Sequence, residues 1–226
     1  MIIFAKSEVV EELKERIRQG EHQTQDFKFR VDDPKKIART LVAFANSDGG
    51  TLLIGVKDNG KVVGVIPEEE YHIIEGAADL FCRPKVSFTS QVWQDDHKLV
   101  LEIIVKPSAQ KPHKAKDDND NWKVYVRRND HTLLANKILL DAWKLEKKTS
   151  LPPQKFSQEE SLVLATLREA QRITISKLYR VTGLKKKDID KMLVLFYNWG
   201  VVEMDISPEG TFYSLADVSK ISNSEN

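Results

Sequence analysis

The chain is poor in cysteine and has no long apolar run. Cys82 is the single cysteine among 226 residues, which excludes an intramolecular disulfide and fits a reducing compartment. No segment approaches the run of about 18 apolar residues that a membrane-spanning helix needs. The first residues also lack the basic start, apolar stretch and cleavage site of a signal peptide. We therefore expect a soluble, cytoplasmic protein with no membrane partner.

An excess of charge of one sign is also absent. The chain has 35 Lys and Arg residues against 34 Asp and Glu residues, a formal net charge of +1. This balance does not by itself predict a nucleic-acid partner, so any basic surface must arise because charges are segregated on the fold. A protein-interaction module that binds no nucleic acid is therefore one of the open hypotheses.

Several motifs of cofactor and metal sites are missing. The five histidines are scattered, and none has the helical spacing or the neighbouring cysteines of a zinc site. There is no G-x-S-x-G motif, and Gly49-Gly50 is not followed by the Lys-Ser/Thr pair of a phosphate-binding P-loop. The sequence therefore predicts no resident cofactor.

The densest structural signals lie between residues 41 and 65. An apolar helical face ends before Gly49-Gly50, which can reverse the chain because glycine adopts positive φ readily. Residues 51–56 are apolar and predict a strand buried on both faces. Asp58-Asn59-Gly60 predicts a hairpin turn, with residues 61–65 as the returning strand.

The same patterns predict the other elements of the first part of the chain. The expected helices are 7–18, 34–45, 67–81 and 133–147, and the further strands are 26–31, 86–93, 98–105 and 123–127. Alternation over 26–31 predicts that Phe27, Phe29 and Val31 face the core, whereas Asp26 and the residues between them face solvent. Residues 106–121 are predicted to form a long polar loop.

The hydrophobic pattern changes near residue 149, which predicts two domains. The fold class expected for the whole chain is α+β. Residues 1–148 form a mixed α/β domain, 149–156 a linker, 157–216 a second domain and 217–226 a disordered tail. The second domain has three helices followed by a hairpin, which is typical of a winged helix-turn-helix.

The first domain resembles the Schlafen AlbA-2 family over roughly residues 7–148. Residues 21–28 are similar to its E-x4-E-F-K motif, and 43–56 to A-F-A-N-x-x-G-G-x-L-x-I-G-V. Residues 58–64 are similar to the D-x-G-x-V-x-G that follows, and 125–132 to Y-x-R-x-G-x-x-T.

The resemblance implies a DNA-binding domain, and bacterial members with a following winged helix include transcriptional regulators. The first hypothesis is therefore a nucleic-acid-binding protein, a DNA-binding transcriptional regulator whose partner is double-stranded DNA. Helix-turn-helix proteins commonly act as homodimers, so a homodimer is expected.

The resemblance also implies an alternative, because three acids serve a metal-dependent RNase in some Schlafen members. Carried over, they are Glu21, Asp26 and Asp58, which would be both catalytic residues and ligands of Mg²⁺ or Mn²⁺. Asp26 departs from the usual glutamate and reaches one methylene less far, and Asn129 stands where the family usually has glycine. A purely structural role is the competing interpretation: Glu21 caps a turn, Asp26 balances Lys28 and Asp58 is a turn residue.

Basic residues at turns and on the exposed strand face are the candidates for phosphate contacts. In the first domain they are Lys28, Arg30, Lys57, Arg127 and Arg128. In the second domain they are Lys185, Lys186 and Lys187, at the start of the predicted recognition helix. The competing interpretation is an ordinary solvated surface of mixed charge.

Overall fold

The computed structural model describes residues 10–145 and 152–217. Its helices and mixed sheets form an α+β fold, as the sequence predicts. Contacts along the chain divide it into two compact units, Met1–Leu134 and Ala135–Asn226, called the first and second unit below. Among the described residues, no helix is long and apolar enough to cross a membrane.

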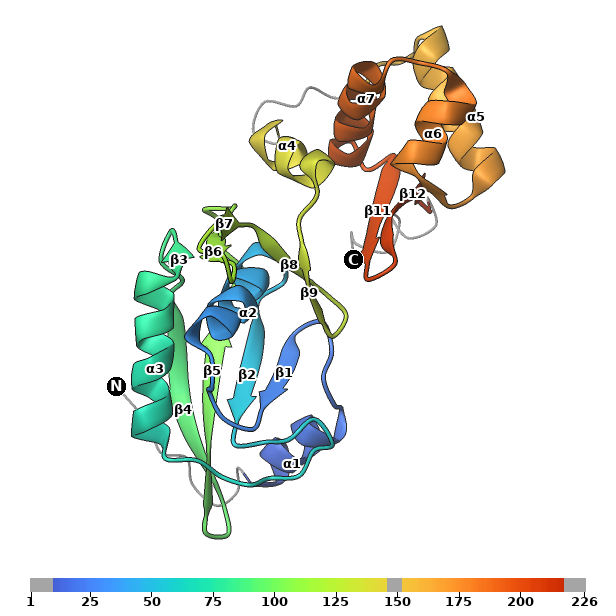
Figure 1. Ribbon diagram of the computed structural model, residues 1–226. Helices are drawn as coiled ribbons and strands as arrows, with labels where there is room; N and C mark the ends of the chain where they lie inside the picture. Colours follow the sequence, from blue (N-terminus) through green and yellow to red (C-terminus); the bar gives the residue numbers. More distant parts are fainter. Residues whose placement is uncertain (1–9, 146–151, 218–226) are drawn as a thin grey trace. The chain divides into compact units, whose positions relative to one another are not determined.

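A four-stranded sheet forms the centre of the first unit (Figure 1). Its strands, in spatial order, are β1 (Gln25–Lys28), β2 (Gly50–Ile54), β5 (Lys98–Val105) and β4 (Phe88–Asp95). β1 runs parallel to β2, and the other two pairs are antiparallel. The predicted strand at 51–56 is therefore the centre of the sheet, with neighbours on both sides.

Helices cover both faces of this sheet. α2 (Pro34–Asn46) and α3 (Pro67–Leu80) pack with Leu52 in the larger hydrophobic core, and α1 (Val10–Arg18) packs with Leu53 in a smaller one. Neighbouring residues of a strand point to opposite faces, so β2 is buried on both sides. This confirms the sequence prediction.

Short strands complete the first unit. β3 (Cys82–Arg83), β6 (Lys114–Lys116) and β7 (Trp122–Lys123) form a three-stranded sheet, and β8 (Tyr125–Arg128) pairs with β9 (His131–Leu134). The segment predicted as one long loop thus contains a strand, and that part of the prediction is wrong. Strands of two or three residues leave too little alternation in the sequence to be seen.

The end of α2 holds these short strands in place. The buried side chain of Asn46 donates hydrogen bonds to the carbonyl oxygens of His113 (2.9 Å) and Tyr125 (2.8 Å), and its Oδ1 accepts one from the His113 amide (2.8 Å). Ser47 Oγ accepts a hydrogen bond from the Arg127 amide at 2.9 Å. Asn46 and Ser47, the polar residues of the motif at 43–56, therefore act as structural ties: their side chains hold the short strands against the end of α2.

The Gly49-Gly50 turn follows directly. Gly49 has φ +76°, and its amide donates to the Phe44 carbonyl oxygen at 3.0 Å. A Cβ at Gly50 would lie 2.4 Å from the Phe44 ring. Glycine is therefore needed at position 49 because of its positive φ, and at position 50 because a side chain there would clash with Phe44.

The strand predicted at 26–31 is shorter than expected, and two of its side chains face the other way. β1 ends at Lys28, whose carbonyl oxygen accepts a hydrogen bond from the Gly55 amide at 2.8 Å. Phe29 is 47% exposed, whereas Asp26 is only 4% exposed because it pairs with Arg127. The predicted orientations of these two residues are therefore wrong.

The predicted turn at 58–60 is present, because the Gly60 amide donates to the Lys57 carbonyl oxygen at 2.8 Å and the Lys57 amide to the Lys61 carbonyl oxygen at 3.0 Å. The predicted partner strand at 61–65 is wrong. That segment makes an isolated bridge, Val56 to Val62, but no strand, because β2 already pairs with β1 and β5. Gly55, with φ +100°, takes the chain out of the extended conformation at the end of β2. The Val65 amide instead donates to the carbonyl oxygen of Leu99 at 2.9 Å.

The second unit contains four described helices, α4 (Lys137–Leu145), α5 (Gln158–Ala170), α6 (Ile175–Thr182) and α7 (Lys186–Asn198). Ser157 and Glu160 form a capping box at the start of α5. The sequence pattern predicts the first of these helices, at 133–147, as part of the first domain, whereas α4 contacts α7 within the second unit.

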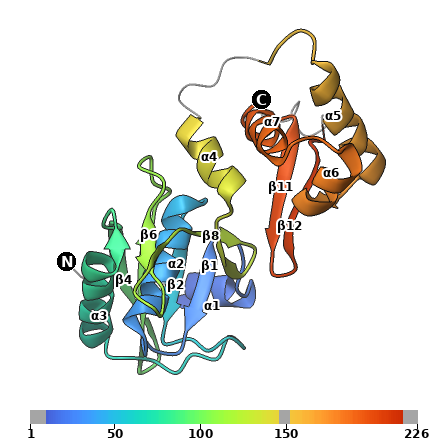
Figure 2. The same cartoon turned by 45° about the horizontal axis from the view of Figure 1, so that its top comes forward.

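A three-stranded sheet accompanies these helices (Figure 2). β11 (Val202–Ser207) and β12 (Gly210–Leu215) form the predicted hairpin, and β10 (Ile173–Thr174) pairs with β12. Of the predicted linker and tail, residues 149–151 and 218–226 lie outside the described residues.

Candidate nucleic-acid interface

Two of the three predicted acids lie together at β1. The Glu21 side chain accepts a hydrogen bond from the Phe27 amide at 2.8 Å. Partial burial, reinforced by the neighbouring Asp26, raises the pKa of Glu21 despite that hydrogen bond. Asp26 is already held by two cations: Arg127 lies 3.0 Å from Oδ1 and Lys28 2.7 Å from Oδ2. Its charge is therefore balanced from within the protein.

The third acid, Asp58, lies in an exposed turn. The Asx hydrogen bond of this turn is made by its neighbour, because Asn59 Oδ1 accepts from the Lys61 amide at 3.1 Å. Within residues 10–145 and 152–217, no three His, Cys, Asp or Glu side chains form a group that could hold a metal ion. Glu21, Asp26 and Asp58 do not form such a group in this structure, and their role as metal ligands stays a prediction.

Arg127 is not the exposed phosphate contact that the sequence predicts. It is 2% exposed, and its guanidinium donates to the carbonyl oxygens of His22 (3.3 Å) and Gln25 (3.1 Å) besides pairing with Asp26. This side chain fastens β8 to β1. The prediction failed because the partners of Arg127 lie about a hundred residues earlier in the chain, where no local pattern reveals them.

Two further basic candidates are partly engaged. Arg128 is half-buried and donates to the Arg127 carbonyl oxygen at 3.1 Å. Lys28 also donates to the Phe27 carbonyl oxygen at 2.8 Å while it pairs with Asp26. Both side chains are thus partly engaged by the protein and partly exposed.

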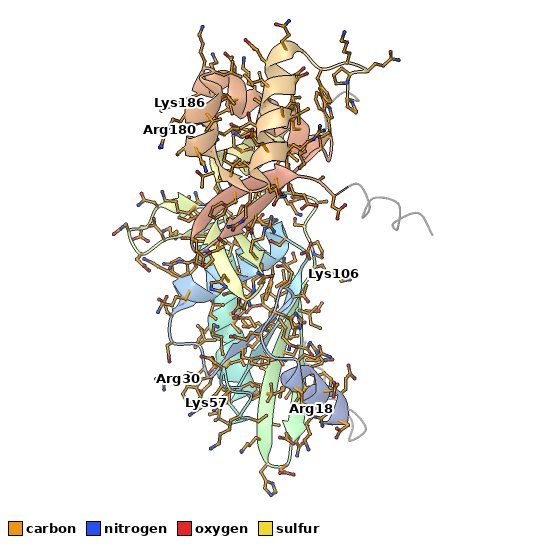
Figure 3. The ribbon with its side chains drawn as sticks, turned by 90° about the vertical axis from the view of Figure 1, so that its right-hand side faces the viewer. Arg18, Arg30, Lys57, Lys106, Arg180 and Lys186 are labelled. Carbon is orange, nitrogen blue, oxygen red and sulfur yellow. The ribbon has the colours of Figure 1, made fainter. Side chains whose placement is uncertain are left out.

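The remaining two candidates meet around an exposed aromatic ring. Lys57 Nζ lies 5.4 Å from the centre of the Phe29 ring, and the Arg30 guanidinium lies 5.8 Å from it. Figure 3 shows Arg30 and Lys57 close together. Arg30 also pairs with the exposed side chain of Asp32. We call Phe29, Arg30 and Lys57 the Phe29 patch.

A second basic and aromatic group was foreseen only for its two loop lysines, Lys114 and Lys116. The register of β3, β6 and β7 places Arg83, Lys114, Lys116 and Trp122 on one face of the small sheet. The Arg83 guanidinium lies 4.4 Å from the centre of the Trp122 ring, and Lys116 Nζ lies 5.6 Å from it. Asp120 pairs with Lys116 at 3.6 Å and lowers the local positive charge. The only sequence signal was the basic character of the predicted loop.

In the second unit, Lys185, Lys186 and Lys187 are exposed at the start of α7. Lys186 Nζ lies 5.6 Å from the centre of the Tyr179 ring. These three side chains can reach outward as the sequence analysis expected, and Asp188 follows them within the first helical turn.

The middle of the outer face of α7 is partly covered, although Lys191 on this side is exposed. Ile189, Leu193 and Phe196 form its buried inner side, and helical geometry places Val194 and Asn198 on the opposite side. Val194 is nevertheless only 7% exposed, and Asn198 donates to the Ala142 carbonyl oxygen of α4 at 3.0 Å. α4 therefore packs against this side of α7.

Comparison with known proteins gives the family. Residues 21–136, about half of the chain, match the family model described as "Schlafen, AlbA_2". The chain belongs to the Schlafen AlbA_2 family. The matched segment contains the Asn46 to Gly50 turn, the Phe29 patch and the basic face of the small sheet.

Two solved structures are similar to this AlbA_2 chain. The DIP2311 protein from Corynebacterium diphtheriae shares 15% identity over 92% of this chain, with a TM-score of 0.41, and the match spans 38% of its own length. The N-terminal domain of a protein from Nitrosomonas europaea, named as related to the ATP-dependent DNA helicase RecG, shares 20% identity. That match covers 65% of this chain and 97% of the domain, with a TM-score of 0.39. No curated protein matches the chain.

Proposed function

We propose that this AlbA_2 protein binds nucleic acid, with double-stranded DNA as its partner and transcriptional regulation as its role. The observation that carries the proposal is the Phe29 patch, an exposed aromatic ring with two cationic side chains beside it. Aromatic rings with neighbouring Lys or Arg are a common means of holding nucleic acid, because the cations pair with phosphates of single or double strands and the ring stacks on the unpaired bases of a single strand.

The contacts within the patch support this use. Phe29 is 47% exposed although it follows a buried strand directly. The Arg30–Asp32 pair is exposed on both sides, so it contributes little stability and a phosphate can replace the carboxylate. Binding nucleic acid would therefore break no buried interaction of the first unit.

The second unit supports a regulatory role. Its helices α5, α6 and α7 are followed by the β11–β12 hairpin, which is the order of elements in a winged helix-turn-helix. Because α4 covers the middle of α7, duplex contacts in this arrangement would come from Lys185, Lys186 and Lys187 in the first turn. Such contacts position a protein on phosphates more than they read sequence.

Equilibrium binding to fluorescently labelled duplex DNA, single-stranded DNA and RNA tests the proposal. We expect affinity to fall steeply between about 50 and 200 mM salt, as it does when phosphates are neutralised. Phe29→Ala should weaken binding to the single-stranded probes by about 5- to 100-fold, the range measured when an aromatic side chain that stacks on an unpaired base is removed, and should weaken duplex binding less. Lys57→Gln should lower the salt slope by about 1, because one phosphate contact is lost.

Control variants show whether a loss of affinity is specific to the Phe29 patch or follows from any loss of an exposed apolar or basic side chain. Leu80→Ala removes another exposed apolar side chain of the first unit, and Lys36→Gln removes another exposed lysine. Both should bind as the unchanged protein does. The proposal fails if no binding occurs at low salt, which would favour an interaction module, or if Phe29→Ala and Leu80→Ala bind equally well.

The metal-dependent nuclease stays an alternative that the same samples test. Its support is the pairing of Glu21 with Asp26, while the engagement of Asp26 by Arg127 and Lys28 weighs against it. Incubation with Mg²⁺ or Mn²⁺ should leave labelled RNA intact under the main proposal, which needs no cofactor. Cleavage that Asp58→Asn abolishes would favour the nuclease.

The homodimer is a further part of this proposal. A two-fold symmetric pair would double the phosphate contacts and match a palindromic site. Light scattering of the full chain, with and without duplex DNA, measures the mass directly. A monomer in both samples would contradict the expectation.

A further inference from the structure

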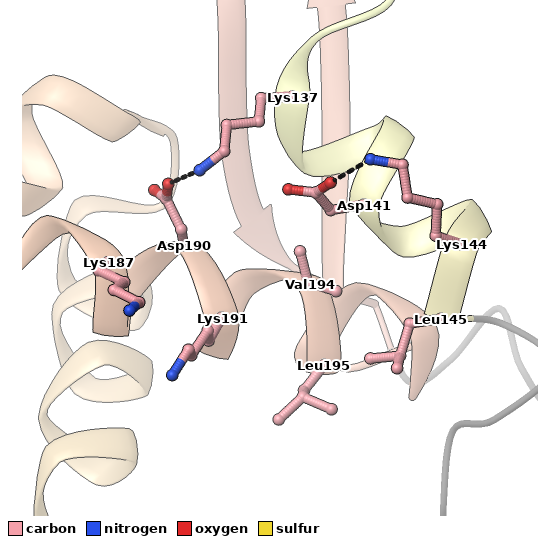
Figure 4. Close-up of a pocket in the computed structure, with 9 residues that line it drawn as sticks. All are labelled: Lys137, Asp141, Lys144, Leu145, Lys187, Asp190, Lys191, Val194 and Leu195. Atoms are coloured by element: carbon pink, nitrogen blue, oxygen red, sulfur yellow. Dashed lines mark hydrogen bonds and ion pairs between the residues drawn. The ribbon is translucent and has the colours of Figure 1, made fainter.

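A pocket of about 590 Å³ lies between α4 and α7 in the second unit (Figure 4). Its volume is in the range of small-molecule sites. Both helices contribute side chains one turn apart, as expected for two helices packed face to face. The lining residues are Lys137, Asp141, Lys144 and Leu145 from α4, and Lys187, Asp190, Lys191, Val194 and Leu195 from α7.

The floor of the pocket is apolar. Val194 is 7% exposed, and Leu195 and Leu145 are half-buried. An apolar portion of a ligand placed here would remove hydrocarbon surface from water, which is favourable in proportion to the area covered. The floor thus suits a hydrophobic body of a few rings or a short chain.

The rim of the pocket is basic, and its charges are unevenly matched. Lys137 pairs with Asp190 at 2.5 Å, and Lys144 pairs with Asp141 at 2.9 Å. Asp190 also accepts a hydrogen bond from the Tyr179 hydroxyl, so it is fully engaged. The two acidic residues that line the pocket are thus each paired with a lysine, and two of the four lysines that line it are left.

Lys187 and Lys191 are the two lysines that remain. Both are exposed, and neither pairs with an acidic group within the described part of the chain. They lie four residues apart on α7, so their like charges face each other on one side of the helix, which costs some helix stability. An anion placed between them would remove this repulsion.

We propose that the pocket between α4 and α7 binds a small organic anion with an apolar body. Lys187 and Lys191 hold its carboxylate, sulfonate or phosphate group, and Val194, Leu195 and Leu145 contact its hydrocarbon part. Because the ligand touches both helices, it holds α4 against α7. The site is independent of the Phe29 patch, which lies in the other unit, but it shares Lys187 with the phosphate contacts proposed for the start of α7.

A pair of fluorescent probes tests the proposal on the full chain. 8-Anilino-1-naphthalenesulfonate has an aromatic body and an anionic group, and N-phenyl-1-naphthylamine has the same body without the charge. We expect saturable binding of one sulfonate probe per chain. The uncharged probe should bind about 10- to 100-fold more weakly, since hydrogen bonds to a charged group are lost.

Variants locate the binding. Lys187→Gln combined with Lys191→Gln should weaken the sulfonate probe by at least tenfold and leave the uncharged probe unchanged. The matched control, Lys177→Gln combined with Arg180→Gln, removes two exposed cations from α6 and should change neither affinity. Val194→Phe should fill the pocket and abolish binding of both probes, with the circular dichroism spectrum retained.

The competing outcomes are distinct. Equal affinity for the two probes, or an unchanged sulfonate affinity in the Lys187 and Lys191 variant, would overturn the proposal. Absence of saturable binding to the unchanged protein would do the same. If Val194→Phe does not fold, the two-lysine variant still decides, because both of its side chains are exposed.

Discussion

Replacing Asn46 by alanine tests whether the family motif is a structural tie. The Asn46 side chain is 2% exposed and makes three hydrogen bonds, two to carbonyl oxygens and one to an amide, at 2.8 to 2.9 Å. Alanine leaves the His113 carbonyl and amide and the Tyr125 carbonyl without these partners. All three belong to segments that the end of α2 holds in place.

The expected cost follows from the number of unpaired groups. A buried polar group that loses its partner costs about 1–3 kcal/mol. Water that enters the space left by the amide would form hydrogen bonds with some of these unpaired groups. We therefore expect Asn46→Ala to destabilise the first unit by about 3–5 kcal/mol. Asn46→Asp should be at least as damaging near neutral pH, because the carboxylate oxygen that replaces Nδ2 would face the carbonyl oxygens of His113 and Tyr125.

Native-state hydrogen exchange measures this change in the first unit separately from the second. The amides of β6 and β8 should exchange more than about 100-fold faster in Asn46→Ala, since each 1.4 kcal/mol is a factor of ten. Asn119→Ala, in an exposed turn of the same unit, is the matched control and should leave the rates unchanged. A loss of less than about 1 kcal/mol in Asn46→Ala would refute the tie, because one ordinary hydrogen bond already contributes that much.

Three further predictions concern stability and reactivity. Gly50→Ala should destabilise by about 1–3 kcal/mol in urea unfolding because its Cβ would lie 2.4 Å from the Phe44 ring, whereas Gly76→Ala, with open space in α3, should stabilise by up to about 1 kcal/mol. The raised pKa of Glu21 means that the folded state binds more protons than the unfolded state just above pH 4.5, so the free energy of unfolding falls as pH rises through this range. Glu21→Gln should remove this pH dependence. A variant with the same pH dependence as the unchanged protein would contradict the prediction. Burial raises the pKa of the Cys82 thiol to about 12, so iodoacetamide should modify the chain only after unfolding, as read by mass spectrometry.

The elements of the central sheet were predictable because their signals are local. Residues 51–56 are apolar without interruption, and burial on both faces is what that pattern means. Period two over residues 26–31 was misleading, because alternation does not show where a strand ends. Phe29 lies beyond the last pair of the β1 ladder, and Asp26 is buried only because Arg127 arrives from a distant strand.

The candidate site was predictable only in part. Arg30 and Lys57 could be named from the sequence, but Phe29, which brings them together, was assigned to the core. The Arg83 and Trp122 contact depends on the pairing of three short strands, which leaves no repeat in the sequence. Pockets between helices, such as that of α4 and α7, require tertiary packing and cannot be derived from periodicity.

The basic face of the small sheet also provides an optical probe of the first unit. Trp93 is 2% exposed, whereas Trp122 is half-buried beside the Arg83 guanidinium. The other two tryptophans, Trp143 and Trp199, belong to the second unit. Acrylamide should therefore quench Trp122 and spare Trp93. An anion that draws Arg83 away from the indole would change its emission, so ligand arrival at this face can be followed without any label.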